Sequence, residues 1–306
     1  MTPNVPPTGH AALRLQRLAT ASIVVAIAVM GIKYLAYLKT GSVALYSDAL
    51  ESIVNVVTAT AALVAIRVGA RPPDHNHPFG HHKAEYLSAI LEGALIIVAA
   101  IMILSEAIDA IRNPRALSDT PIGLAINGLA TIINTSWAWL LINRGTAWRS
   151  PALVADGHHI FTDVITSVGV FVGVALATWT GWLLLDPLIA CLVAVNILWT
   201  GYKLTMQSMS ELLDEAASPA IVARIHQAIA DNGSGALEAH DVRTRRAGRM
   251  TFIEFHLVVP GEMSVQDAHV ICDRLEAAIE SELQDADVVI HVEPDHKSKS
   301  APDVPL

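Results

Sequence analysis

Six long apolar stretches dominate this sequence and restrict it to a membrane-spanning fold. They run over Ala19–Tyr37, Val43–Val68, Tyr86–Ile111, Ile122–Ile142, Pro151–Thr180 and Leu183–Met206. A helix of about 20 apolar residues crosses the hydrocarbon core of a bilayer, and these stretches have the required length. Hydrophobic residues make up 53% of the chain and charged residues only 16%. We therefore expect an all-α bundle of six transmembrane helices over residues 1–209.

An even number of spans places both termini on one side of the membrane, and the basic residues near the helix ends indicate which side that is. Arginine and lysine are more frequent on the side of the N-terminus (Arg14, Arg17, Arg67, Arg71, Lys83, Arg144, Arg149) than on the other (Lys39, Arg112, Arg115). We expect both termini to be cytoplasmic. The histidine-rich loop 71–85 falls on the same side.

The fifth apolar stretch contains ionisable side chains that membrane helices rarely carry. Asp156, His159 and Asp163 follow one another at offsets of three and four, so they share one face of a helix. Such groups are costly within a bilayer and are expected to face a cavity or one another. A carboxylate and an imidazole one turn apart suit a divalent transition metal. A hydrogen-bond network that joins the helices is the alternative.

The second apolar stretch repeats this pattern. Its Asp48, Glu51 and Asn55 have the same spacing as the three polar residues of the fifth stretch. Two helices therefore carry polar side chains in matching register, and four of them could converge as ligands: Glu51, Asn55, His159 and Asp163. A tetrahedral cage of oxygen and nitrogen atoms suits Zn²⁺, with Fe²⁺, Mn²⁺ and Co²⁺ as further candidates.

The segment 210–296 has the composition of a small soluble domain. Ser218 and Pro219 begin a helix that Gly233 ends, and Val265–Leu283 is amphipathic. Strands are predicted over residues 240–245, 250–259 and 288–292. The order α-β-β-α-β indicates an α+β fold, an open sheet with helices on one face. We expect its exposed sheet surface to bind another copy of the chain. Residues 297–306 are expected to form a disordered tail.

Charge and motif content argue against several classes of protein. The net charge of −9 argues against a nucleic-acid partner. Cys191 and Cys272 form no spaced pair, so neither a disulfide framework nor a thiolate zinc site is indicated. The sequence has no His-Glu-x-x-His motif. An intramembrane metal-dependent hydrolase and a metal sensor that does not transport remain alternatives to a transporter.

Three segments, on a layout of six spans followed by a small domain, resemble the cation diffusion facilitators. This is a family of divalent-metal/proton antiporters, and the most similar branch is bacterial zinc and ferrous-iron efflux. The segments are Asp74–Glu85 (DHNHPFGHHKAE), Ala155–Asp163 (ADGHHIFTD) and Ala239–Arg245 (AHDVRTR). The resemblance implies a homodimer in the inner membrane and a metallochaperone-like fold for the cytoplasmic domain 210–296.

The resemblance also implies a transport site within the membrane. Its ligands would be Glu51, Asn55, His159 and Asp163, with Asp48 and Asp156 one turn away as second-sphere partners or proton acceptors. The family usually has Asp or His at position 51 and Asp at position 55. This chain therefore departs from the pattern at two of its four ligands.

Two further metal sites and one charge pair are implied in the same way. Asp74, His77 and His81 match a site in the loop, for which a solvated loop with incidental histidines is the alternative. A regulatory two-metal site in the C-terminal domain would be formed by His240, His256, His269, His291 and Glu293. Lys83 and Asp214 match a charge pair near the dimer axis.

These observations predict a secondary transporter rather than an enzyme. It would export Zn²⁺, or Fe²⁺, Mn²⁺, Co²⁺ or Ni²⁺, from the cytoplasm in exchange for protons. Metal ligands must be deprotonated, so the same side chains hold either the metal or protons. Opening the site alternately to each side of the membrane then couples the two flows.

Overall fold

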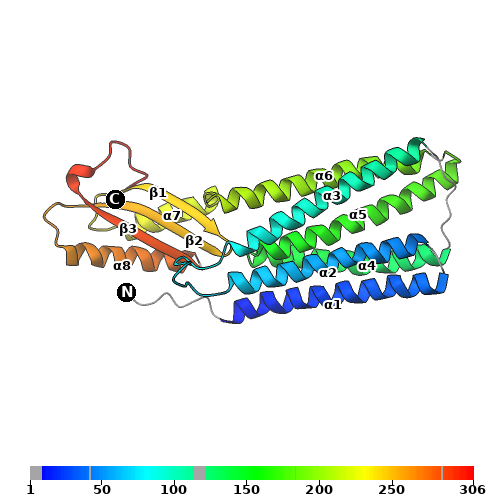
Figure 1. Ribbon diagram of the computed structural model, residues 1–306. Helices are drawn as coiled ribbons and strands as arrows, with labels where there is room; N and C mark the ends of the chain where they lie inside the picture. The colour runs from blue at the N-terminus through cyan, green and yellow to red at the C-terminus, as the bar shows by residue number, and fades with distance from the viewer. Residues whose placement is uncertain (1–8, 41–42, 113–120, 183, 284) are drawn as a thin grey trace. The chain divides into compact units, whose positions relative to one another are not determined.

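The computed structural model describes residues 9–40, 43–112, 121–182, 184–283 and 285–306 (Figure 1). The chain divides into two compact units, Met1–Met209 and Ser210–Leu306. Each unit has its own hydrophobic core, built from side chains of that unit alone. The units are therefore described one at a time.

Among the described residues, the first unit consists of six long helices. They are α1 (Gly9–Thr40), α2 (Val43–Gly69), α3 (Ala84–Arg112), α4 (Pro121–Ala147), α5 (Pro151–Thr180) and α6 (Leu185–Leu212). One helix lies at each expected span. Pro151 opens α5, a position where the missing N–H of proline leaves no helix hydrogen bond unmade.

Helix α5 has neighbours on several sides within this unit. It contacts α2, α3 and α4, and α2 and α4 in turn contact α1. Gly157 allows α4 to approach closely, because a Cβ atom there would lie 2.7 Å from Cγ1 of Ile142 and 3.1 Å from its backbone nitrogen. The polar residues of α5 thus lie on a helix surrounded by others.

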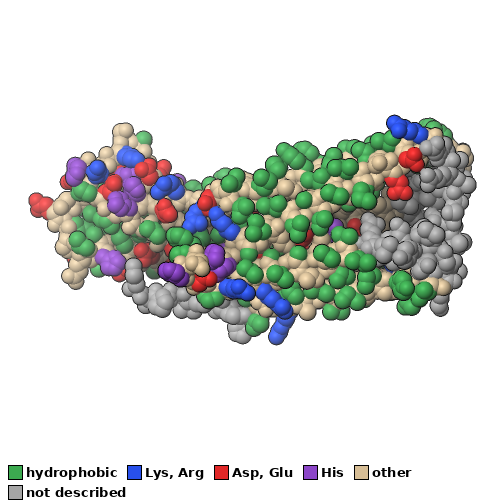
Figure 2. Space-filling model, viewed as in Figure 1, with side chains coloured by type: hydrophobic (Ala, Val, Ile, Leu, Met, Phe, Trp, Pro, Cys, Tyr) green, Lys and Arg blue, Asp and Glu red, His purple; other side chains and the backbone are tan. Residues whose placement is uncertain are grey.

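The outer surface of the helices is apolar, as a bilayer requires. Figure 2 shows hydrophobic side chains spread over the helical unit, and many large ones are exposed, including Val24, Leu91, Trp139 and Leu192. Within the described residues, four stretches are long and apolar enough to cross a membrane: Ala12–Leu35, Ser52–Gly69, Ala84–Arg112 and Pro187–Leu212. Crossing by α4 and α5 remains a prediction from the sequence.

The second unit is a small α+β domain, as the sequence predicts. Its elements are α7 (Pro219–Asn232), β1 (Glu238–Ala247), β2 (Met250–Val259), α8 (Val265–Glu282), β3 (Ala286–Pro294), the 3₁₀ turn η1 (Asp295–Lys297) and β4 (Val304–Pro305). The sheet order is β3-β2-β1-β4, with β2 antiparallel to β1 and parallel to β3. Helices α7 and α8 contact each other and share one core with the sheet, to which Ile253, Phe255 and Leu257 of β2 contribute.

The end of the chain differs from the expected disordered tail. Val304 pairs with Ala239 of β1, and its side chain is only 4% exposed within the core. The backbone N–H of Val242 donates to Asp303 at 2.9 Å, and that of Leu306 donates to the carbonyl of Leu237 at 3.2 Å. The polar composition of residues 297–303 gives no sign that the chain ends with a buried Val304 and a partly buried Leu306, which pack against the core beside β1.

The burial of Val304 leads to a stability prediction. Val304→Ala should lower the free energy of unfolding of the second unit by about 1–2 kcal/mol, because it removes buried methyl groups and leaves a cavity. The matched control is Val265→Ala, since Val265 is 89% exposed in the same unit. The control should change stability by no more than about 0.5 kcal/mol. Calorimetry of the full chain in detergent measures both, and equal unfolding temperatures for the two variants would contradict the placement of β4.

Candidate metal sites

Two polar side chains predicted to be ligands meet between α2 and α5. The amide Nδ2 of Asn55 donates a hydrogen bond to Oδ2 of Asp163 at 2.7 Å, although the residues are 108 positions apart. The matching spacing of polar residues on the two helices predicts this meeting. Glu51 and Asp48 belong to α2, one and two turns before Asn55 respectively, but their side chains lie outside the described part of the structure.

His159 lies one turn before Asp163 on α5 and is 5% exposed. Both of its ring nitrogens are buried, and neither has a hydrogen-bond partner among the residues that the structure describes. A buried imidazole without a partner is unfavourable, because its polar atoms have lost water and gained nothing in return. A divalent cation would satisfy a ring nitrogen directly, so the surroundings of His159 fit a metal ligand.

Asp156 has a different role in the described structure. It is fully buried, and its Oδ2 accepts a hydrogen bond from Oγ of Ser22 on α1 at 2.6 Å. Ser22 in turn accepts one from Nε1 of Trp137 on α4 at 3.1 Å. This chain of contacts links α5 to α1 and α4. It has the form of the helix-joining network that the sequence offers as the alternative to a metal ligand.

Sequence reasoning missed a second buried acid, Glu92 on α3. It is 0% exposed, and its Oε1 accepts a hydrogen bond from Oγ of Ser88 at 3.0 Å. Its Oε2 is buried without a hydrogen-bond partner in the described part of the chain. The signal was available, because Glu92 interrupts the apolar stretch Tyr86–Ile111 four residues after Ser88 and well before the other acidic residues, Glu106 and Asp109. Glu92 belongs with Asp156 among the carboxyl groups that this bundle buries.

The loop between α2 and α3 brings Asp74, His77 and His81 together, as predicted. Nδ1 of His77 lies 3.1 Å from Oδ1 of Asp74, and Nε2 of His81 lies 3.3 Å from Oδ2. The donor atoms of these three residues all lie within 4.8 Å of one another. The backbone N–H of His77, which donates to Oδ1 at 2.7 Å, is the main cause of a pKa for Asp74 below its usual value. The carboxylate is thus anionic and positioned between two imidazoles.

In the second unit, strand register places three histidines side by side. His240 of β1 pairs with His256 of β2, and His256 pairs with His291 of β3. Side chains directly opposite on neighbouring strands project from the same face of a sheet. Since Phe255 and Leu257, the neighbours of His256, enter the helix-covered core, the histidines belong to the other face.

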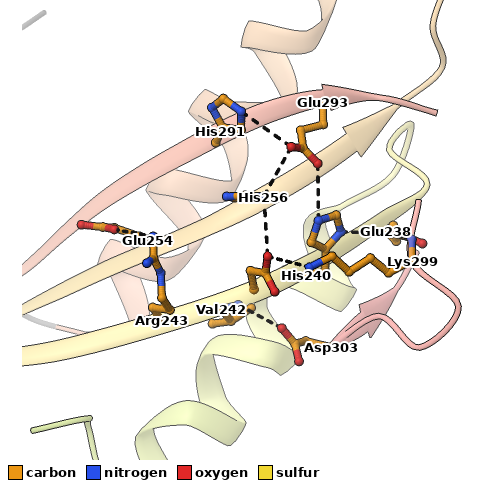
Figure 3. A network of polar contacts seen from close by, with 11 residues as sticks. Glu238, His240, Val242, Arg243, Glu254, His256, His291, Glu293, Lys299 and Asp303 are labelled. Carbon is orange, nitrogen blue, oxygen red and sulfur yellow. Dashed lines mark hydrogen bonds and ion pairs between the residues drawn. The ribbon is translucent and has the colours of Figure 1, made fainter. Parts of the chain in front are cut away.

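Glu293, two residues after His291 on β3, completes this group (Figure 3). Its carboxylate lies 3.4 Å from Nε2 of His240, 3.5 Å from Nδ1 of His256 and 3.7 Å from Nε2 of His291. Donor atoms of His240, His256 and Glu293 all lie within 4.8 Å of one another. Two imidazole nitrogens and a carboxylate oxygen form a donor set that suits Zn²⁺, so these residues fit a metal ion.

Three polar residues that sequence reasoning did not single out surround this cluster. Oε1 of Glu238 lies 3.0 Å from Nδ1 of His240, leaving Nε2 to face Glu293. Oδ2 of Asp241 lies 3.9 Å from Nδ1 of His256. The ammonium of Lys299 donates to the same Asp241 oxygen at 2.7 Å, and this bond is the main cause of a pKa for Asp241 below its usual value.

Two other predicted features remain predictions. His269 projects from α8, is mostly exposed, and has Nε2 3.7 Å from Oδ1 of Asp273, so within this chain it does not join the cluster. Asp214 lies 3.6 Å from Arg245 of its own unit. Because Lys83 belongs to the other unit, the predicted pair between Lys83 and Asp214 is untested.

Known protein families match nearly the whole chain. Residues 19–213 match the family described as the cation efflux transmembrane domain, and residues 217–295 match the cytoplasmic domain of cation efflux proteins. An uncharacterised transporter of Synechocystis is 45% identical over 93% of each chain. The cation-efflux pump FieF of Shewanella oneidensis is 31% identical over 90% of this chain and 92% of its own.

Two solved structures match the C-terminal part. One is the Zn form of CzrB, 45% identical in sequence, covering 28% of this chain and 98% of its own with a TM-score of 0.27. The other is the metal-bound C-terminal domain of CzcD from Thermotoga maritima, 32% identical, covering 26% of this chain and 93% of its own with a TM-score of 0.25.

The contact between Asn55 and Asp163 leads to a prediction about charge. Asn55→Asp replaces an amide donor with a second carboxylate 2.7 Å from Asp163, so without metal the two groups repel or must share a proton. The variant should therefore unfold at a lower temperature than the parent in the presence of a chelator. Added zinc should raise its unfolding temperature by more than it raises the parent's, because a cation between two carboxylates is held more strongly.

The matched control is Asn143→Asp, which adds the same charge at an exposed position of α4. Its unfolding temperature should stay close to that of the parent, with and without zinc. Differential scanning fluorimetry of the detergent-solubilised chain measures all three proteins. An equal zinc-dependent rise in the parent and in Asn55→Asp would contradict a metal ligand at position 55.

Proposed function

Because the chain belongs to the cation diffusion facilitator family, a family of cation efflux transporters, we propose that it exports a divalent transition metal in exchange for protons. Proteins of this family are transporters and not enzymes, which removes the intramembrane hydrolase from the alternatives. Zn²⁺ is the proposed substrate, since imidazole and carboxylate ligands in a tetrahedral cage suit it best. Both termini are proposed to be cytoplasmic in a multi-pass protein of the inner membrane.

The main support for this proposal is the buried imidazole of His159. It is buried in a helical membrane unit, its two ring nitrogens have no hydrogen-bond partner among the described residues, and it lies one turn from the contact between Asn55 and Asp163. Interior packing alone would leave an apolar side chain there. An imidazole next to a carboxylate instead offers binding to a cation that enters and leaves. Glu51, one turn before Asn55, is proposed as the fourth ligand.

Coupling to protons follows from the chemistry of these ligands. An imidazole or carboxylate must be free of its proton to bind a metal, so loading the site with metal on one side of the membrane releases protons there. When the loaded site opens to the other side, the metal leaves and the same groups take up protons there. The inward proton gradient then drives metal outward, provided that the site is never open to both sides at once.

The cluster in the C-terminal unit is proposed as a regulatory metal site. His240, His256 and Glu293 would hold the ion, with His291 beside them and His269 added only when two copies of the chain assemble. A metal bound only in the assembled state would favour a homodimer by mass action. Asp74, His77 and His81 in the loop are proposed as a third site, close to the cytoplasmic end of α2.

The transport proposal is tested by zinc flux into proteoliposomes that carry a pH gradient. The parent should move zinc against protons, whereas Asp163→Ala should reduce flux to the level of protein-free vesicles, because it removes an anionic ligand. The matched control is Glu106→Ala, an exposed carboxylate on α3, which should retain the parent's flux. Unchanged flux in Asp163→Ala would refute the site. A parent that binds zinc but moves none would instead indicate a sensor, and repeating the assay with Fe²⁺, Mn²⁺, Co²⁺ and Ni²⁺ ranks the substrates.

A further inference from the structure

The C-terminal end of the chain lies against the strand that supplies His240. After η1 the chain reaches Lys299 and then returns to β1, where β4 pairs with Glu238 and Ala239. The burial of Val304 and the bond from Val242 to Asp303 fix this segment on β1. Residues 298–306 are therefore part of the folded domain next to the metal cluster.

Lys299 makes two polar contacts, and both go to carboxylates that also contact the ligand histidines (Figure 3). Its backbone N–H donates to Oε1 of Glu238 at 2.7 Å, and the same oxygen lies 3.0 Å from His240. Its ammonium donates to Oδ2 of Asp241 at 2.7 Å, and that oxygen lies 3.9 Å from Nδ1 of His256. The ammonium of Lys299 and the ring of His256 thus contact the same carboxylate, that of Asp241.

The backbone of β1 explains how Asp241 reaches this face of the sheet. In a regular strand, consecutive side chains project from opposite faces, so Asp241 would point away from its neighbour His240. The pairing of β1 with β2 instead shifts register between His240 and Arg243, and Asp241 adopts a left-handed φ of 54°. A bulge of this kind redirects a side chain, and a non-glycine residue in that conformation is unfavourable by itself.

Among the described residues three donors meet in this cluster, whereas a tetrahedral ion takes four, and His291 lies outside this group although its Nε2 is 3.7 Å from Glu293. His240, His256 and Glu293 supply donor atoms within 4.8 Å of one another, a group that does not include Asp241. Asp241 is nevertheless close to His256, and its carboxylate is directed toward the ammonium of Lys299. Carboxylate oxygen is an accepted zinc ligand, and a small movement of this side chain would add it to the other three.

We propose that Asp241 is a further ligand of this cluster and that Lys299 competes with the metal ion for its carboxylate. Lys299 acts as an internal cation that neutralises Asp241 when no metal is present and yields it when metal binds. The C-terminal segment thereby sets the metal concentration at which the site fills. This inference rests on the proposed regulatory site and adds a ligand and a competitor to it.

The inference is tested by zinc calorimetry on the full chain carrying Asp163→Ala, His77→Ala and His81→Ala, which removes the other proposed sites. In this background Lys299→Ala should tighten zinc binding about two- to fivefold, the range expected when a partly exposed ion pair no longer competes. Lys299→Arg keeps the charge and should bind zinc as the background protein does. The matched control is Lys297→Ala, which removes the same charge from an exposed position two residues earlier and should leave the affinity unchanged.

Asp241→Asn completes a double-mutant cycle. It should weaken zinc binding about tenfold or more, the order of effect seen when groups around a metal are removed. In the Asp241→Asn background, Lys299→Ala should have no further effect, because the two residues act through the same carboxylate. If the effects of the two substitutions on zinc affinity were additive, Lys299 would not compete with the metal for Asp241.

The possible failures are distinguishable. Zinc binding that Asp241→Asn leaves unchanged, or that Lys299→Ala and Lys297→Ala alter equally, would overturn the inference alone. Zinc binding that His240→Ala and His256→Ala do not weaken would overturn the regulatory site itself, and this inference with it.

Discussion

The helical unit depends on how it satisfies polar side chains where hydrocarbon surrounds the bundle. A buried donor or acceptor needs a partner within the protein, because no solvent is available to replace one. One oxygen of Asp156 accepts from Ser22, one of Glu92 from Ser88 and one of Asp163 from Asn55. The other oxygens of Asp156 and Glu92 are buried without a partner among the described residues. His159 has no hydrogen-bond partner among the described residues. The described bundle thus gives each of these carboxyl groups a hydroxyl or amide donor, whereas both nitrogens of the imidazole have none, as the proposed metal ligand requires.

Under the proposed function, α5 carries both a structural polar group and the transport ligands. Asp156 lies in a chain of hydrogen bonds that links α5 with α1 and α4. Two turns later, Asp163 contacts α2 through the neutral amide of Asn55, which can give way to an ion. A site that binds and releases metal needs ligands of moderate strength. Asn55 in place of a carboxylate makes the empty site less negative and is compatible with rapid release.

Much of the architecture could be predicted from the sequence, because the apolar stretches and the repeated polar spacing are local patterns. The meeting of Asn55 with Asp163 was predicted in this way, whereas the group formed by Asp74, His77 and His81 was implied by the family resemblance of the loop. Other contacts between distant segments have no corresponding pattern in the sequence. The contact of Ser22 with Asp156, and that of Lys299 with Asp241, depend on how helices pack and on where a bulge falls. The expected disordered tail was wrong for the same reason, since Val304 finds its place only once β1 is formed.

The most direct measurement is the coordination of zinc in the membrane site. Zinc-edge X-ray absorption on the full chain, with His77, His81, His240 and His256 replaced by alanine, reports which atoms bind the ion. We predict one imidazole nitrogen and otherwise oxygen ligands at about 2.0–2.2 Å, with no sulfur, and loss of the imidazole signal in His159→Ala. A spectrum without imidazole, or one that His159→Ala does not change, would contradict a transport site built on α5.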